Sequence, residues 1–124
     1  MNAPLEMNRA EWFALKRAAR DLDVAKGGYW RLYRGGRIAF FCGPEHPAPG
    51  VPPPKRTGPW PEPRALVGMA VASPLPGGWV LVRLEPWDEP SQDATRVWLA
   101  RQFERLRDHA AGGLLDRVAE ATQN

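Results

Sequence analysis

Nine of the fourteen prolines in this 124-residue chain lie within one stretch, GPEHPAPGVPPPKRTGPWPEPR, at residues 43–64. Proline lacks a backbone amide donor and fixes φ, so neither an α-helix nor a central β-strand can pass through such a segment. We therefore expect a long, stiff surface loop with polyproline-like conformations. The helices and strands must come from the sequence on either side of this loop.

Two β-hairpins are predicted, one on each side of the Pro-rich loop. Gly35-Gly36 lies between two alternating runs, at residues 29–34 and 37–42. A two-residue turn of the primed type needs positive φ, which glycine adopts without steric cost, so this pair predicts a tight hairpin. After the loop, residues 65–72 and 79–85 have the composition of strands, and SPLPGG between them predicts a six-residue turn.

An amphipathic helix is predicted before the first hairpin. Asn8 followed by Glu11 has the form of a capping box, and the helical pattern continues to about residue 26. Gly27-Gly28 would then end the helix. One side of the helix is apolar and is expected to face a core. The cations on another side, expected to face water or an anion, are Arg9, Lys16 and Arg20.

Two further helices are predicted after the second hairpin. Ser91 or Asp93 can cap a helix that runs to about residue 111, because apolar residues recur there at helical spacing. Gly112-Gly113 is expected to break it. A short last helix at residues 114–122 would follow, with a frayed end after residue 122.

The order of these elements predicts the fold class. It fits an α+β domain in which an antiparallel sheet of about four strands packs against the N-terminal helix and the C-terminal helices. The chain length is that of one domain, so residues 1–124 are expected to form a single domain. Hydrophobic residues at 44% and charged residues at 25% are typical of a globular protein.

Composition also indicates a compartment. A single cysteine, Cys42, excludes an internal disulfide, and the first residues lack the charged-then-apolar pattern of a secretory signal. The longest mostly apolar run, residues 65–75, is far shorter than the roughly 20 residues that span a bilayer. We expect a cytoplasmic protein with no membrane contact.

The two-residue turn also predicts how the first hairpin divides its side chains. It would pair Tyr33 with Ile38 and Arg31 with Phe40. The face expected to join the core carries Trp30, Leu32, Ala39 and Phe41. The opposite face carries Tyr29, Arg31, Tyr33, Ile38 and Phe40.

This second face is the main candidate for a binding site. Aromatic rings on an open sheet stack on bases, and arginines between them neutralise phosphates, as in single-strand-binding surfaces. The candidate residues for binding nucleic acid or a partner are Tyr29, Arg31, Tyr33, Arg34, Arg37, Phe40, Arg9, Lys16 and Arg20. Two structural alternatives remain open: helices cover both faces, or the rings form cross-strand pairs with the arginine stems.

Two isolated features add to this hypothesis. Phe13 lies among the cations of the first helix, where it would anchor an interface, stack on a base or be covered by the Pro-rich loop. Lys55 and Arg56 follow three prolines in that loop and are further candidates for reaching a phosphate. The PxxP spacings of the loop alternatively fit docking to an aromatic groove of a partner.

Catalytic and metal chemistry are disfavoured. Cys42 and His46 supply two zinc ligands where a tetrahedral site needs four, and only one other histidine exists. The acids Glu85, Asp88, Glu89 and Asp93 are better explained by the start of a helix, whose dipole favours negative charge. No phosphate-binding loop, nucleophile elbow or zinc-protease motif is present.

The sequence thus predicts a small, non-catalytic binding module with no cofactor and no small-molecule substrate. Its expected partner is nucleic acid or a protein complex bound to nucleic acid. The alternative is a protein-protein interaction factor, such as a small phage or mobile-element inhibitor that blocks a partner complex.

Overall fold

A computed structural model describes residues 4–22, 29–43, 47–51, 65–87 and 92–122. Its centre is an antiparallel sheet with the strand order β1-β5-β4-β3-β2. The strands are β1 (Leu5–Asn8), β2 (Trp30–Tyr33), β3 (Arg37–Cys42), β4 (Ala65–Leu75) and β5 (Trp79–Pro86). Two helices accompany the sheet, α1 (Arg9–Asp21) and α2 (Gln92–Thr122). The predicted α+β class is confirmed.

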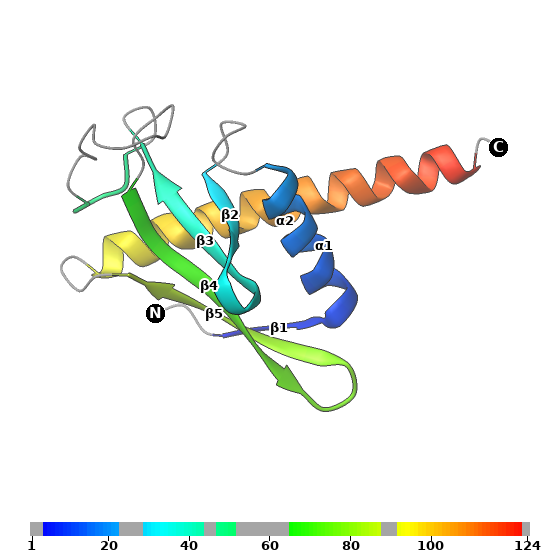
Figure 1. Ribbon diagram of the computed structural model, residues 1–124, viewed down its shortest axis with the longest axis horizontal. Coiled ribbons are helices and arrows are strands. Elements are labelled where there is room, and N and C mark those ends of the chain that lie inside the picture. Colours follow the sequence, from blue (N-terminus) through cyan, green and yellow to red (C-terminus); the bar gives the residue numbers. More distant parts are fainter. Residues whose placement is uncertain (1–3, 23–28, 44–46, 52–64, 88–91, 123–124) are drawn as a thin grey trace.

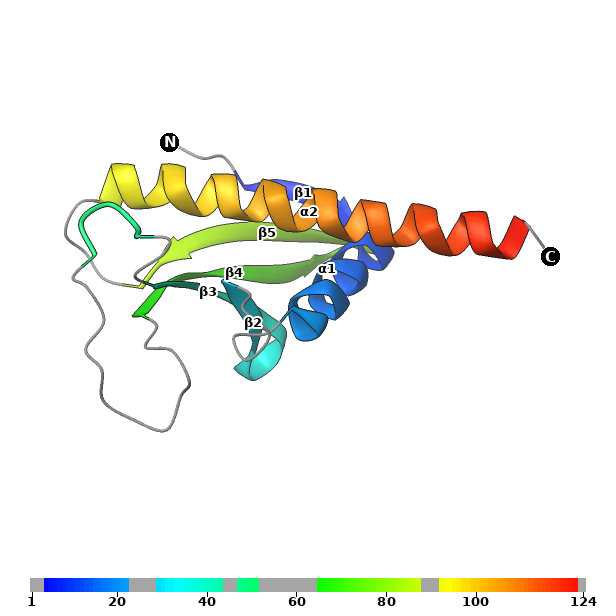
Figure 2. The same cartoon turned by 90° about the horizontal axis from the view of Figure 1, so that it is seen from above.

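Both helices contribute to a core on one face of the sheet. Figure 2 shows α2 running along one side of the strands, while α1 lies beside β2 at one end. The largest fully buried side chains come from both helices and from β1 and β3: Phe40, Met7, Leu15, Ile38, Leu99 and Leu106. In Figure 1 the strands pass in front of α2, so this view shows the sheet face that points away from α2.

Strand β1 was not predicted, and it brings the sheet to five strands. It has only four residues, too few for an alternating pattern to be recognised, yet Met7 is fully buried in the core. β1 pairs with β5, with Asn8 opposite Trp79. The chain passes directly from β1 into α1, so the pairing with β5 fixes where α1 begins.

The start of α1 agrees with the predicted cap. The Glu11 amide donates a hydrogen bond to Asn8 Oδ1 at 2.7 Å, which satisfies one of the free donors of the first turn. The helix ends at Asp21, before the expected residue 26, and the predicted Gly27-Gly28 stop lies outside the described residues. Arg107 of α2 contacts Glu11 at 2.9 Å and so ties the two helices together.

Helix α2 continues through Gly112-Gly113, so the predicted break into two helices is wrong. Glycine costs a helix only about 1 kcal/mol relative to alanine, a cost that the neighbouring turns can offset. The C-terminal part of α2 extends beyond the edge of the sheet in both views (Figures 1 and 2). Neither helix, over the residues described, combines the length and the apolar composition needed to cross a membrane.

Replacing Gly112 by alanine is expected to stabilise the protein. A Cβ added at this position would meet no atom within 4 Å, and alanine restricts the unfolded chain more than glycine does. We expect the free energy of unfolding to rise by about 0.5–1 kcal/mol. Urea denaturation followed by circular dichroism would measure it, and a fall in stability would contradict a continuous helix at Gly112.

The predicted register of the first hairpin is wrong by one residue. Tyr33 pairs with Arg37, and Trp30 pairs with Phe40. The loop therefore contains three residues, Arg34–Gly36, with positive φ at both glycines, 70° and 74°. Because side chains alternate along a strand, this one-residue shift moves every side chain of β3 to the other face relative to β2.

The shift corrects the predicted faces of β3. Ile38 and Phe40, expected on the binding face, are fully buried in the core beneath the helices. Phe41, expected in that core, lies instead in a smaller buried cluster with Ala39 and Met69. We call the sheet face that carries this cluster the outer sheet face; its further members are Arg31, Tyr33, Leu66 and Val71.

The second hairpin is longer than predicted, and its turn is shorter. β4 continues to Leu75, which pairs with Trp79, so residues 76–78 form the turn in place of the expected six residues. Of the Pro-rich segment, Gly43 and residues 47–51 are described. Ala48 is buried there, and the Pro49 carbonyl accepts a hydrogen bond from Thr95 of α2 at 3.3 Å. The rest of the segment lies outside the described residues, so the predicted Pro-rich loop remains a prediction.

Candidate nucleic-acid interface

A pocket of about 310 Å³ lies between the first turns of α1 and the β4–β5 hairpin. The two elements meet there because β1 pairs with β5 immediately before α1 begins. The Arg9 amide also donates a hydrogen bond to the carbonyl oxygen of Gly78, in the hairpin turn, at 3.0 Å. The pocket walls are thus joined by backbone hydrogen bonds.

Cations and aromatic rings line this pocket together. Helix α1 contributes Arg9, Trp12, Phe13 and Lys16, and the hairpin contributes Trp79. The Lys16 Nζ lies 4.4 Å from the centroid of the Phe13 ring, and the Arg9 guanidinium carbon lies 5.9 Å from it. Both cations lie over the ring at distances that allow cation–π attraction. No acidic residue is among the described residues that line the pocket.

The rings differ in exposure. Trp12 is buried and belongs to the core, whereas Phe13 is 49% exposed and Trp79 is 48% exposed. Burying the rest of these two rings would remove a large apolar area from water. Phe13 therefore has the exposure expected of a residue that contacts a partner.

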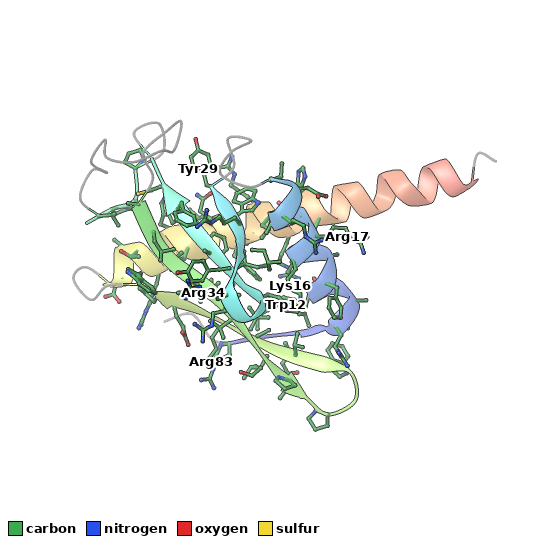
Figure 3. The ribbon with its side chains drawn as sticks, viewed as in Figure 1. Trp12, Lys16, Arg17, Tyr29, Arg34 and Arg83 are labelled. Atoms are coloured by element: carbon green, nitrogen blue, oxygen red, sulfur yellow. The ribbon has the colours of Figure 1, made fainter. Side chains whose placement is uncertain are left out.

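The tip of the β2–β3 hairpin lies beside the same side of α1. A Cβ at Gly36 would come within 3.7 Å of Lys16 Nζ, so the ammonium group lies against the hairpin loop. Figure 3 labels Trp12 and Lys16 on α1, next to this loop, and Arg34 on the hairpin itself. Arg34 and Arg37 are both exposed. Lys16 thus belongs to the pocket lining and also lies next to the hairpin loop.

The outer sheet face is partly covered by its own side chains, in contrast to the open face that the sequence predicts. The Arg31 guanidinium lies 5.0 Å from the centroid of the Phe41 ring, so this arginine stacks on a ring of its own sheet. Ala39, Phe41 and Met69 are buried there. Arg83, labelled in Figure 3, belongs to this face because it pairs with Val71. The contact between Arg31 and Phe41 joins an arginine to a ring of the neighbouring strand through the guanidinium group.

The predicted site residues therefore separate into groups. Arg9 and Lys16 are brought together in the pocket, and Lys16 also lies against the hairpin loop that begins at Arg34. Arg37 pairs with Tyr33 and so belongs to the outer sheet face. Arg20 is exposed on α1, one turn beyond Lys16. Tyr29 is half-buried against the main core, and Arg31 and Tyr33 lie on the outer sheet face. Phe40 is a core residue, which excludes it from a surface site. Lys55 and Arg56 lie outside the described residues.

Trp79 is the site residue that sequence reasoning missed. It is the first residue of β5, and strand alternation alone gives no reason to place it near α1. Trp79 comes close to α1 only because β1 pairs with β5, and β1 is a strand of four residues. That pairing is a long-range contact, which a local sequence pattern does not reveal. Only the position of Trp79 beside the turn glycines, at the exposed end of a hairpin, could have indicated an exposed ring.

The other candidate chemistries gain no support from the described residues. Cys42 is buried at the end of β3, as expected of a structural cysteine, and His46 lies outside the described residues. Asp88 and Glu89 also lie outside them. Within the part of the chain that the structure describes, no three Cys, His, Asp or Glu side chains come close enough to hold a metal ion.

Comparison of the chain with protein-family models, with curated proteins and with solved structures found no match.

Proposed function

We propose that this protein is a small, non-catalytic binding module that contacts nucleic acid, or a protein complex bound to nucleic acid. The observation that carries the proposal is the pocket between α1 and the β4–β5 hairpin. Half-exposed Phe13 lies there under the cations Arg9 and Lys16, and half-exposed Trp79 is part of the same lining. Nucleic acid is the ligand that combines flat aromatic groups with negative charge at short spacing.

The surrounding charges support the same ligand. Lys16 lies against the hairpin loop, which begins with the exposed Arg34, so a further cation lies at the end of the hairpin next to the pocket. Arginine forms two parallel hydrogen bonds to a phosphate, and lysine adds a mobile point charge. Contacts of this kind supply affinity without reading the base sequence.

Binding to a fluorescent oligonucleotide should weaken steeply as salt rises, because cations that neutralise phosphates release bound counterions. Exchanging Arg9 and Lys16 for glutamate together should lower the association constant at least about tenfold, since two attractive contacts become repulsive. Fluorescence anisotropy at several salt concentrations measures both effects. The slope of log K against log salt should also fall, by about 0.7 to 0.9 for each lost contact.

A matched control changes the net charge by the same amount elsewhere. Arg101 and Arg105 are exposed on α2, outside the pocket lining. Their joint exchange for glutamate should leave most of the affinity unchanged. Equal losses in the two double variants would show that net charge alone governs binding. Absence of binding to both DNA and RNA at low salt would refute direct contact with nucleic acid, which is the form of the proposal that the pocket supports.

A protein partner is the second candidate, because half-exposed aromatic rings also act as anchors in protein interfaces. A small inhibitor of a phage or mobile element that blocks a partner complex would use Phe13 and Trp79 in this way. A pull-down with the tagged chain, repeated after nuclease treatment, distinguishes the two. Capture of one defined complex that resists nuclease and is lost on Phe13→Ala would favour the protein partner.

A further inference from the structure

We propose that the pocket between α1 and the β4–β5 hairpin takes up an unpaired base, so that the ligand of this protein is a single strand. This inference rests on the proposed function and adds that the bound nucleic acid is single-stranded. Its first support is the place of the two rings. Phe13 lies on the α1 wall and Trp79 on the hairpin wall, each about half-exposed at 49% and 48%.

Stacking on the Trp79 ring requires a base whose faces are free, because Phe13 already carries Arg9 and Lys16 over its ring. In a duplex the base faces are covered by neighbouring base pairs, and a protein reaches only the edges and the phosphates. An unpaired base can be turned outward and placed on an aromatic side chain. The volume of about 310 Å³ is at the lower end of the range for small-ligand sites, which suits one base better than a helix or a strand of a protein partner.

The charge of the pocket favours a phosphate-linked base over an uncharged aromatic group. Lys16 Nζ and the Arg9 guanidinium lie over the Phe13 ring, 4.4 Å and 5.9 Å from its centroid, so two cations are available to a phosphate in the pocket. The described lining contributes no acid that would repel a phosphate. Lys16 Nζ lies against the hairpin loop, whose first residue, Arg34, is an exposed cation that could meet the next phosphate of a strand.

The pocket is also held in place before any ligand arrives. The bond from the Arg9 amide to Gly78 and the pairing of Asn8 with Trp79 join its two walls. The Trp79 ring lies over the turn, because a Cβ at Gly77 would come within 3.6 Å of its Cδ1. Trp12, anchored in the core, forms part of the lining. Such a site loses little conformational freedom on binding, which favours affinity.

The test compares single-stranded and duplex oligonucleotides of one sequence, bound to the wild type and to Trp79→Ala. We expect the single strand to bind at least about tenfold more tightly than the duplex. Loss of one base–aromatic stack should weaken single-strand binding about 5- to 150-fold and leave duplex binding within about twofold. Trp79→Phe keeps a ring and should restore most of the affinity, which separates stacking from misfolding.

Trp87 provides a matched control. It is 52% exposed and follows the other end of β5, away from the pocket lining. Trp87→Ala should therefore leave both affinities unchanged. A loss of single-strand binding in Trp87→Ala equal to that in Trp79→Ala would overturn the assignment of the pocket.

The remaining outcomes separate this inference from the proposed function. If duplex and single strand bind equally and Trp79→Ala has no effect, while glutamate at Arg9 and Lys16 weakens binding, the base pocket is wrong and nucleic-acid binding stands. If neither form binds, the base pocket and direct binding to nucleic acid are both wrong. A free mononucleotide that competes as strongly as the oligonucleotide would also overturn the inference, because the pocket would then serve a small molecule.

Discussion

Phe40→Ala should lower the free energy of unfolding by about 3–5 kcal/mol, the range for truncating a buried phenylalanine. Phe40 has no exposed surface, and its ring meets that of Phe103 on α2 edge to face, with centroids 6.4 Å apart. Alanine would leave a cavity between the sheet and the helix and would remove this ring pair. Urea denaturation of the wild type and the variant, followed by circular dichroism, measures the change.

Phe41→Ala is the matched control, because the two residues are neighbours of identical type on opposite faces. Phe41 is 9% exposed and lies in the smaller cluster, where its ring also carries Arg31. Less apolar area is lost there and water can fill part of the space, so we expect a loss of about 2 kcal/mol. A larger loss for Phe41→Ala than for Phe40→Ala would support the two-residue turn and contradict the observed register.

The error in this register has a physical origin. Gly35-Gly36 is compatible with a two-residue turn and equally with a three-residue loop that includes Arg34. The hydrophobic pattern does not decide between them, since Ile38 and Phe40 on one face and Ala39 and Phe41 on the other are all buried. Both faces of β3 are apolar, so the alternation of its side chains does not indicate which face packs against the helices.

Features set by neighbouring residues were predicted well. The cap of α1 by Asn8 and the placement of both hairpins depend on contacts within a few residues. The cations of α1 were also placed correctly, because a helix fixes which side chains share a side. The predicted break at Gly112-Gly113 failed because helix propensity is a weak preference that neighbouring turns override.

Only the α1 wall of the candidate site was predicted, because the other wall depends on a contact between distant parts of the chain. The α1 wall with Arg9, Phe13 and Lys16 follows from local periodicity, whereas Trp79 enters through the pairing of β1 with β5. That pairing joins residues more than seventy positions apart, through a strand of four residues. A single sequence carries no local signal for such a contact, so the pocket becomes visible only once the sheet is assembled.

Gly68→Ala is expected to be among the most damaging single-methyl additions in the described chain. Gly68 lies in the inner strand β4, opposite Phe40 of β3 and Pro86 of β5. A Cβ there would come within 2.6 Å of the Glu85 carbonyl oxygen and 2.7 Å of Leu99 Cδ1 on α2. The leucine can turn away, but the carbonyl belongs to the paired strand and can move only if β4 and β5 separate. The expected loss is about 3 kcal/mol or more, at the upper end for overpacked cores.

The same substitution at Gly112 separates this steric effect from the general effect of replacing glycine by alanine. No atom lies within 4 Å of a Cβ at Gly112, so Gly112→Ala should stabilise while Gly68→Ala destabilises. Denaturation midpoints of the two variants and the wild type, measured side by side, give the comparison. Gly68 has no side chain, so Leu99 of α2 packs directly on the sheet. If Gly68→Ala left the stability unchanged, α2 would have to pack farther from β4 than the structure shows. A loss of stability in Gly68→Ala but not in Gly112→Ala would instead support the close contact between α2 and β4.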